Sequence, residues 1–266
     1  MPDVDLNGIR LYYERWGSGP RLLFLNGSGT SIASSEPLIR RFADCFDTAV
    51  HDQRGLGRTS IPPGPYTMAD YAADAAAFLD HLGWDRCRVV GVSFGGMVAQ
   101  ELAVTRPDRV DRLALLCTSP GGEGGASYPL HELQDLTEDE RTRRSVRLLD
   151  TRFTTEWLAS RPADRAVLEM LMTRAAAKRT AEQRRGEREQ LEARRGHDVW
   201  ERLPAVVCPT FVACGRFDGI APLGNGEAIA TRVPLGQLHV YEGGHLFMVQ
   251  DPRALPEVIA FLAADS

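Results

Sequence analysis

Short runs of apolar residues, each closed by glycine or by polar residues, recur along the chain. Each run has the length of a strand and does not alternate in polarity, which is typical of strands buried on both faces of a mostly parallel sheet. Six such runs predict strands at residues 21–25, 46–51, 88–92, 113–117, 210–214 and 237–241. Before them, Asn7-Gly8 joins two apolar segments, 4–7 and 9–14, and predicts a β-hairpin at the start of the chain.

Apolar residues at helical spacing appear between the predicted strands. They predict a helix over residues 66–82 and another over 94–106, which Pro107 ends. Strands that alternate with helices indicate an α/β fold, with a mostly parallel sheet and helices on both of its faces.

The alternation stops between residues 121 and 203, where no strand pattern appears and helical patterns do. Thr137 and Glu140 form a capping box that starts one helix. Further helical segments cover 162–178 and 180–195. This stretch therefore predicts helices alone, whereas the rest of the chain predicts strands that alternate with helices.

We interpret this difference as a core with an insertion. Residues 1–120 and 204–266 are predicted to form the α/β core, and residues 121–203 a helical lid inserted after the sixth strand. A chain of 266 residues is long enough to bury a core of this size without disulfides.

Composition and charge narrow the class of protein. Hydrophobic residues make up 43% of the chain and charged residues 25%, which is ordinary for a globular protein. The net charge of -5 supplies no basic field, so we expect no nucleic-acid partner. No run of about 18 apolar residues occurs, and no basic start precedes an apolar stretch, so we expect a cytoplasmic protein without a membrane partner. These features do not indicate an oligomeric state.

Five cysteines lie far apart, without Cys-x-x-Cys spacing: Cys45, Cys87, Cys117, Cys208 and Cys214. Most of them fall inside apolar runs, which favours buried thiols over a disulfide framework or a zinc site. We therefore expect neither a metal nor a cofactor.

A nucleophile motif stands where a predicted strand meets a predicted helix. Residues 91–96 read Gly-Val-Ser-Phe-Gly-Gly. A serine in such a strained turn needs glycine two positions before and after it, because a Cβ would collide with the neighbouring strand and helix. A phosphate-binding turn would instead show Gly-x-Gly-x-x-Gly spacing or a Gly-Lys-Ser/Thr ending, and neither is present. We predict that Ser93 is the nucleophile.

A serine hydroxyl attacks at neutral pH when a base, usually a histidine, takes its proton. His245 follows the last predicted strand after Gly243 and Gly244, which free the backbone to place the ring over the sheet. We predict that His245 is this base. Of the other histidines, His51, His81 and His239 are expected to have structural roles. His131 and His197, in the lid, are expected to be solvated, the alternative being a contact with the substrate.

A carboxylate must hold the base in the right tautomer and stabilise its cation. Asp218 follows the strand at 210–214 and is predicted to do so, the alternative being an aspartate that caps the turn before Gly219. Two backbone amides are predicted to bind the oxyanion. They belong to Phe94, directly after the nucleophile, and to Ser28, in a loop that could otherwise be a simple tight turn.

Taken in order, these motifs resemble the α/β-hydrolase superfamily over essentially the whole chain. The matching signatures are the Ser93 turn, residues 52–57, residues 215–218 and Gly244-His245, with serine, acid and histidine in the family's order. Asn26-Gly27 and residues 97–100 resemble the esterase and lactonase branch typified by 3-oxoadipate enol-lactonases, although many members have histidine in place of Asn26. Serine as the nucleophile argues against the epoxide hydrolase and haloalkane dehalogenase branches, which use aspartate.

The resemblance implies a serine hydrolase that cleaves a small to medium carboxylic ester or lactone through an acyl-serine. The alternatives are a carbon–carbon bond hydrolase of a vinylogous diketone, an aminopeptidase on the same fold, and a non-catalytic ligand-binding protein. The expected partner is a small-molecule substrate. Because a lid must bury one apolar face, we expect Trp157 and Met172 to line an apolar acyl pocket that faces Ser93.

Overall fold

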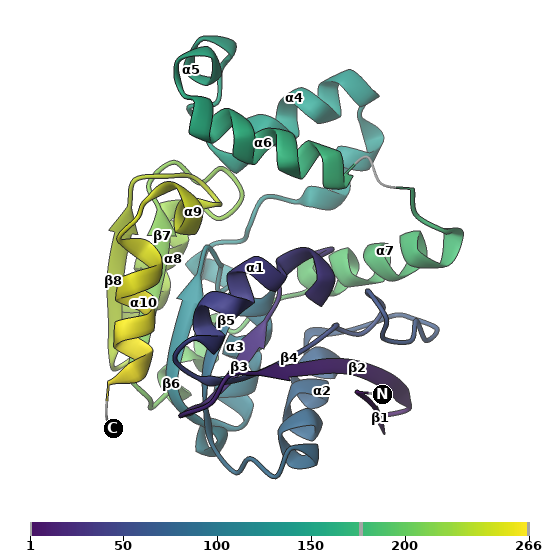
Figure 1. Cartoon of the computed structure of the whole chain (residues 1–266), viewed down its shortest axis with the longest axis vertical. Helices are drawn as coiled ribbons and strands as arrows, with labels where there is room; N and C mark the ends of the chain where they lie inside the picture. The colour runs from purple at the N-terminus through teal and green to yellow at the C-terminus, as the bar shows by residue number, and fades with distance from the viewer. Residues whose placement is uncertain (1, 176–177, 265–266) are drawn as a thin grey trace.

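The computed structural model describes residues 2–175 and 178–264, which form a single sheet of eight strands (Figure 1). The strands lie in the order β1-β2-β4-β3-β5-β6-β7-β8. β2 pairs antiparallel with both β1 and β4, and all the other neighbours are parallel. The strands are β1 (Asp3–Leu6), β2 (Ile9–Trp16), β3 (Arg21–Leu25), β4 (Asp47–His51), β5 (Cys87–Val92), β6 (Val110–Leu116), β7 (Thr210–Gly215) and β8 (Gly236–Tyr241).

The hairpin and the strands form where the sequence predicts them. β8 differs from the prediction in its burial, because it is an edge strand of the sheet and only Tyr241 in it is buried. Asn7 and Gly8 both have positive φ, 49° and 74°, as the tight turn requires. β6 begins earlier than predicted, because Val110 already pairs with Cys87 of β5 before a shift in register. The polar residues that follow Val110 interrupt the apolar pattern although they belong to the strand.

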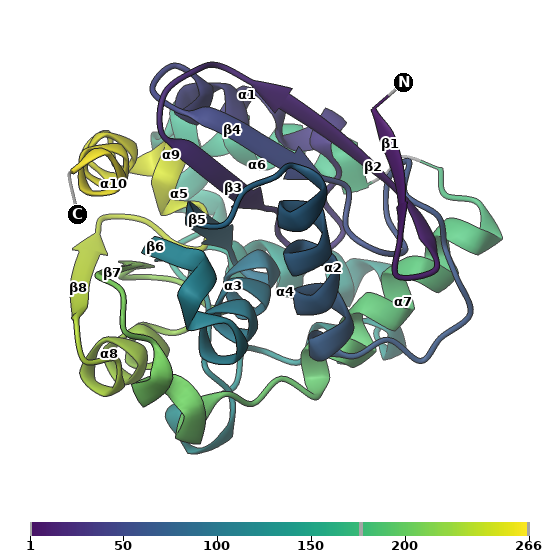
Figure 2. The ribbon, with the colours of Figure 1, turned by 90° about the horizontal axis from the view of Figure 1, so that it is seen from below.

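Helices cover both faces of the sheet (Figure 2). One face carries α1 (Ile32–Ala43) and α10 (Ala254–Ala263); the other carries α2 (Met68–His81), α3 (Phe94–Thr105) and α8 (Leu223–Arg232). The short helix α9 (Phe247–Gln250) follows β8. None of the described helices is both long and apolar enough to cross a membrane.

The pleat of β3 divides the core into two layers. Leu23 and Leu25 belong to the same buried cluster as residues of α2 and α3, whereas Leu22 and Phe24 belong to that of α1 and α10. The ring of Phe24 meets that of Phe42 in α1 edge-on, with 5.5 Å between ring centroids. Because both faces of the strand are buried from Leu22 to Leu25, these four residues are all apolar.

Between β6 and β7 the described residues form helices and no strand. The helices are α4 (Glu138–Leu149), α5 (Thr155–Ser160), α6 (Pro162–Ala175) and α7 (Ala181–Arg195), with 3₁₀ turns at Gly122–Gly124, Leu130–Asp135 and Trp200–Ala205. The predicted capping box is present at α4, where the Glu140 carboxylate accepts the Thr137 amide at 3.1 Å. The last part of the helix predicted over 162–178 includes residues 176–177, which lie outside the described residues.

The helices of this segment occupy two places (Figure 1). α4, α5 and α6 form a layer above the sheet, whereas α7 lies against the core, where Ala193 belongs to the same buried cluster as residues of α2 and α3. A Cβ at Gly186 of α7 would lie 2.0 Å from the carbonyl oxygen of Gly55, so glycine is needed for this close approach. Arg185, which precedes Gly186, donates to the carbonyl oxygens of Ile61 and Pro62, both at 2.7 Å.

Candidate active site

Ser93 lies at the turn between β5 and α3, in a strained backbone conformation. Its φ of 53° and ψ of -114° lie outside the regions usual for serine, and its hydroxyl does not cap α3. A Cβ on Gly91 would lie 2.4 Å from the carbonyl oxygen of Gly95, and one on Gly95 would lie 2.1 Å from that of Leu25. Glycine at both positions therefore allows the strand, the turn and the helix to pack this closely.

The structure brings Ser93, His245 and Asp218 into one hydrogen-bonded row. His245 Nε2 lies 3.0 Å from Ser93 Oγ, and His245 Nδ1 lies 2.8 Å from Asp218 Oδ2. All three residues are more than nine-tenths buried. These distances suit proton transfer from the hydroxyl to the imidazole, with the carboxylate holding the opposite ring nitrogen.

Asp218 uses both of its oxygens. Oδ1 accepts hydrogen bonds from the amides of Ile220 and Ala221, at 2.7 and 2.9 Å, and Oδ2 faces His245. The carboxylate therefore caps the turn that follows it and also holds the imidazole. The sequence left open whether Asp218 holds the base or caps the turn before Gly219, and the structure shows that one carboxylate makes both sets of contacts.

The loops that carry the acid and the histidine touch directly. A Cβ on Gly215, at the end of β7, would lie 2.0 Å from the carbonyl oxygen of Gly244. The amide of Phe217 donates to the carbonyl of Gly243 at 2.9 Å. Glycines on both loops therefore bring Asp218 within hydrogen-bond distance of His245.

The amides of Ser28 and Phe94 lie on two loops that meet at the serine. The Phe94 amide stands at the N-terminus of α3, where backbone donors favour negative charge. Within the described part of the chain, neither amide donates to another backbone group. A Cβ on Gly27 would lie 3.6 Å from the Cβ of Ser93, which places the loop before Ser28 against the serine turn.

Two glutamines that the sequence analysis did not single out hold this loop. Gln53 Nε2 donates to the carbonyl oxygen of Asn26 at 2.5 Å, and Gln190 Oε1 accepts the amide of Gly29 at 2.8 Å. Gln53 lies in the family signature over residues 52–57, and this match is the only feature of the sequence that could have indicated its role. Gln190 comes from α7, far along the chain, and nothing in its local sequence indicates the contact.

The end of α4 lies between the acid loop and the histidine loop. The amide of Gly219 donates to the Leu148 carbonyl at 3.0 Å, and the amide of His245 donates to the Leu149 carbonyl at 2.6 Å. Thr151 returns a hydrogen bond from its amide to the Phe217 carbonyl at 2.9 Å. The segment predicted as a lid therefore supports the backbone of the site itself.

Gln250 of α9 extends this support. Its Oε1 accepts the amide of Gly244 at 2.8 Å, and its Nε2 donates to Asp150 at 3.0 Å and to Asp164 at 3.1 Å. Asp150 is fully buried and also pairs with Arg152 at 2.7 Å. The residue before His245 is thus tied to two carboxylates of the inserted segment.

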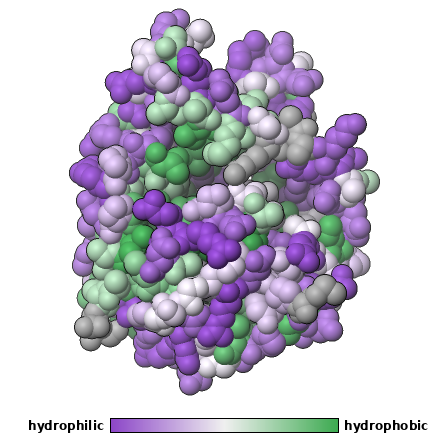
Figure 3. Space-filling model, in the orientation of Figure 1, coloured by the Kyte–Doolittle hydropathy of each residue, from purple (hydrophilic) through white to green (hydrophobic). Residues whose placement is uncertain are grey.

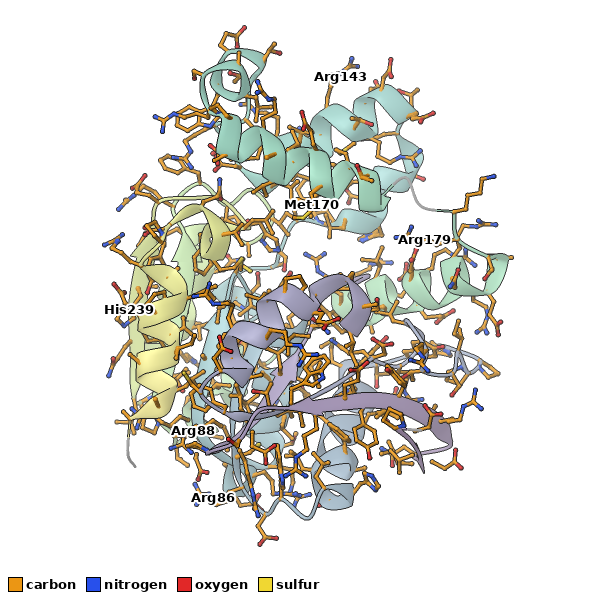
Figure 4. The ribbon with its side chains drawn as sticks, viewed as in Figure 1. Arg86, Arg88, Arg143, Met170, Arg179 and His239 are labelled. Carbon is orange, nitrogen blue, oxygen red and sulfur yellow. The ribbon has the colours of Figure 1, made fainter. Side chains whose placement is uncertain are left out.

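The structure places the predicted pocket residues on α5 and α6. The indole of Trp157 donates to Asp164 at 2.9 Å, and its ring lies beside the guanidinium groups of Arg152 and Arg161. Met172 is partly buried. Figure 4 shows Met170 on the side of α6 that faces the core, and Figure 3 shows hydrophobic surface on and below this helix. A pocket role for Trp157 and Met172 stays a prediction.

Other expectations concern histidines, thiols and metals. His197 is only 6% exposed, so the expectation that it is solvated is wrong. Its backbone packs against Gly121, where a Cβ would lie 2.0 Å from the His197 carbonyl oxygen. Burial lowers the pKa of His197 to about 4.

All five cysteines are free, and Cys45 is the one that is exposed. Among the described residues, no cluster of three or more histidine, cysteine or acidic side chains could hold a metal ion.

Comparison with known proteins agrees with the fold. A family model described as the alpha/beta hydrolase fold matches residues 20–252. The chain therefore belongs to the α/β-hydrolase family, as its motifs predicted, and is a hydrolase.

Particular relatives match over nearly the whole chain. A 3-oxoadipate enol-lactonase of Acinetobacter baylyi is 26% identical over 254 residues, covering 94% of this chain and 92% of the relative. A poly(3-hydroxyalkanoate) depolymerase of Ectopseudomonas oleovorans is 29% identical over 240 residues, covering 90% and 82%. The crystal structure of an enol-lactonase from Burkholderia xenovorans superposes with a TM-score of 0.82 at 21% identity, covering 99% of this chain and 100% of that one.

Proposed function

We propose that this hydrolase cleaves a small to medium carboxylic ester or lactone through an acyl-serine intermediate. The observation that carries the proposal is the buried row from Asp218 through His245 to the Ser93 hydroxyl. The similarity to a protein named as an enol-lactonase supports an ester or lactone as the substrate class.

Each group has a defined step. As Ser93 Oγ attacks the carbonyl carbon, His245 Nε2 takes its proton, and Asp218 stabilises the imidazolium through Nδ1–H. The amides of Ser28 and Phe94 donate to the oxygen that becomes negatively charged. When the tetrahedral intermediate collapses, the carbon–oxygen bond to the leaving group breaks and His245 returns the proton to the departing oxygen. Water, activated by the same imidazole, then releases the acid and restores Ser93.

The proposal also gives the inserted segment a role. Residues 121–203 act as a lid over the core formed by 1–120 and 204–266, and Trp157 and Met172 line the acyl pocket. A layer of helices above the site excludes water during the reaction and contacts the variable part of the substrate.

Labelling with a fluorophosphonate tests the nucleophile. We expect mass spectrometry to place one adduct on Ser93, no adduct in Ser93→Ala, and much slower labelling in His245→Gln. A panel of aryl esters, lactones and vinylogous diketones should show turnover of esters or lactones. An adduct elsewhere, or turnover of diketones alone, would contradict the proposal.

A further inference from the structure

A cavity of about 110 Å³ with a mixed polar and apolar lining lies beside Met97, one helical turn after Ser93 on α3. The residues that line it include Ser119, Arg194 and His197. No described residue that lines it is acidic. A cavity of this volume has room for several waters or for a carboxylate group.

Arg194 lines this cavity without a carboxylate partner. It is only 7% exposed, and Nη1 donates to the carbonyl oxygen of Tyr128 at 2.9 Å. Its Nε and Nη2 have no hydrogen-bond partner among the described residues, and burial lowers the pKa of Arg194 to about 10. A guanidinium remains charged at that pKa, and a buried charge is costly unless an anion pairs with it.

The neighbouring groups are polar and also incompletely paired. Neither ring nitrogen of the buried His197 makes a hydrogen bond of good geometry with another described residue, although the backbone of Ser119 lies close to the ring. Ser119 Oγ accepts from Asn225 at 2.7 Å and from Ser127 at 2.9 Å. Unpaired donors and a positive charge therefore stand buried beside the cavity, an arrangement that suits an anionic group.

The cavity adjoins the proposed reaction site. Gln190, which holds the amide of Gly29, precedes Arg194 by one turn on the same face of α7. On the opposite side, Thr118 donates to the carbonyl oxygen of Ser93 at 2.8 Å, and the next residue, Ser119, lines the cavity. The cavity is therefore joined to the Ser93 turn through Met97 and through Thr118-Ser119.

We propose that Arg194 binds a carboxylate of the substrate in this cavity, so that the preferred esters or lactones are anionic. The inference rests on the proposed function and specifies its substrate class. Nε and Nη2 of a guanidinium lie side by side, so together they bind the two oxygens of one carboxylate. His197 and Ser119 complete the polar wall around it.

Binding to an inactive enzyme tests this site independently of catalysis. In Ser93→Ala, we expect succinate, glutarate or adipate to bind more tightly than the monoacid of equal length, measured by isothermal titration calorimetry. Adding Arg194→Met should weaken dicarboxylate binding by about 10- to 100-fold and leave the monoacid almost unchanged. Arg188→Met, an exposed arginine of the same helix, is the matched control and should change neither.

Kinetics tests the same preference and locates the carboxylate. Wild-type kcat/KM is expected to be higher for monomethyl succinate, glutarate or adipate than for the methyl ester of the matching monoacid. Comparing 4-acetoxybutanoate with butyl acetate places the charge on the leaving group instead of the acyl group. Arg194→Met should remove the preference by lowering kcat/KM for the anionic ester alone, and Arg194→Lys should retain part of it.

The outcomes separate the two proposals. Equal dicarboxylate binding with and without Arg194, or a parallel loss for charged and neutral esters in a folded Arg194→Met variant, would overturn the carboxylate site. Arg194-dependent binding without turnover of any ester would keep the site and overturn the proposed reaction. Circular dichroism checks folding. If Arg194→Met does not fold, the test rests on Arg194→Lys and on the wild-type ratio of kcat/KM for charged and neutral esters, and a ratio near one would overturn the carboxylate site.

Discussion

For single residues, the geometry of the site depends on which side-chain atoms already accept hydrogen bonds from the backbone. Two backbone amides hold Oδ1 of Asp218, so only Oδ2 is left for His245. The carboxylate cannot rotate without losing these bonds. The imidazole tautomer is therefore set by one oxygen, which must accept a hydrogen bond.

Asp218→Asn should lower kcat by about 10⁴-fold with the fold intact, because an amide nitrogen facing Nδ1 would favour the wrong tautomer. Steady-state kinetics on an aryl ester measures the loss, and circular dichroism checks the fold. Glu242→Gln, an exposed neighbour of the histidine loop, is the control and should keep full activity. If Asp218→Asn keeps more than about a tenth of the activity, another carboxylate holds the histidine.

At the scale of elements, the inserted segment is joined to the catalytic loops as well as lying over them. The carbonyls of Leu148 and Leu149 accept amides from the loops of Asp218 and His245, and Gln250 ties Gly244 to Asp150 and Asp164. Such contacts make Gln250 a positioning residue, because it acts on His245 through the backbone.

Gln250→Met keeps the length of the side chain and removes its three hydrogen bonds. We expect kcat to fall about tenfold with little change in KM, because the imidazole is misplaced while the pocket remains, and the free energy of unfolding to fall by about 1–3 kcal/mol. Val249→Ala, an exposed neighbour, should change neither. A lower stability with unchanged kcat would limit Gln250 to a structural role.

The second prediction at this scale concerns specificity. The triad and the amides act on atoms common to all esters, so acyl selection must come from the pocket, at about 1–3 kcal/mol per methylene. Trp157→Ala and Met172→Ala should change the ranking of kcat/KM from acetate to octanoate esters, while an aryl acetate keeps its rate within a few fold.

Trp157→Phe separates packing from hydrogen bonding, because it keeps an aromatic ring and removes the bond to Asp164. If aryl acetate hydrolysis falls in parallel with the longer esters in Trp157→Ala and also in Trp157→Phe, Trp157 supports the network of Gln250. The assignment to the acyl pocket would then be wrong.

At the scale of the whole molecule, stability depends on buried histidines. Burial lowers the pKa of His51 to about 4, and that of His197 likewise. The unfolded chain, with a histidine pKa near 6.5, takes up protons first as the pH falls. The contribution of these two histidines to the free energy of unfolding is therefore fully present above about pH 6.5 and is lost as the pH falls toward 4.

The variant His51→Asn isolates one of these contributions. His51 packs edge-on against Phe78, so the variant should be less stable than the wild type at pH 7. The difference in unfolding free energy should shrink by about 2 kcal/mol by pH 5, because only the wild type loses the histidine contribution. Urea unfolding at both values measures it, with the exposed His81→Asn as control. A difference independent of pH would contradict the assignment.

Features that depend on local chain geometry could be predicted from the sequence. The hairpin requires two positive φ values in succession, and Asn7-Gly8 supplies them. The serine turn needs its flanking glycines whatever the rest of the protein does, and the apolar runs are a direct consequence of strands buried on both faces. Ser93, Asp218 and His245 each follow such a strand, so the pattern of the strands indicated where these side chains would meet.

The tertiary structure decided what covers and supports the site. The contacts of Gln190 with Gly29 and of Leu149 with His245 join residues far apart in the chain, and the carbonyls and amides involved have no sequence signature. Arg194 and His197 lie in a polar, charged stretch that predicts a solvated surface. Their burial follows from α7 packing on the core and from the turns that close around its end, because burial depends on which surfaces meet, and that information lies outside any local stretch of residues.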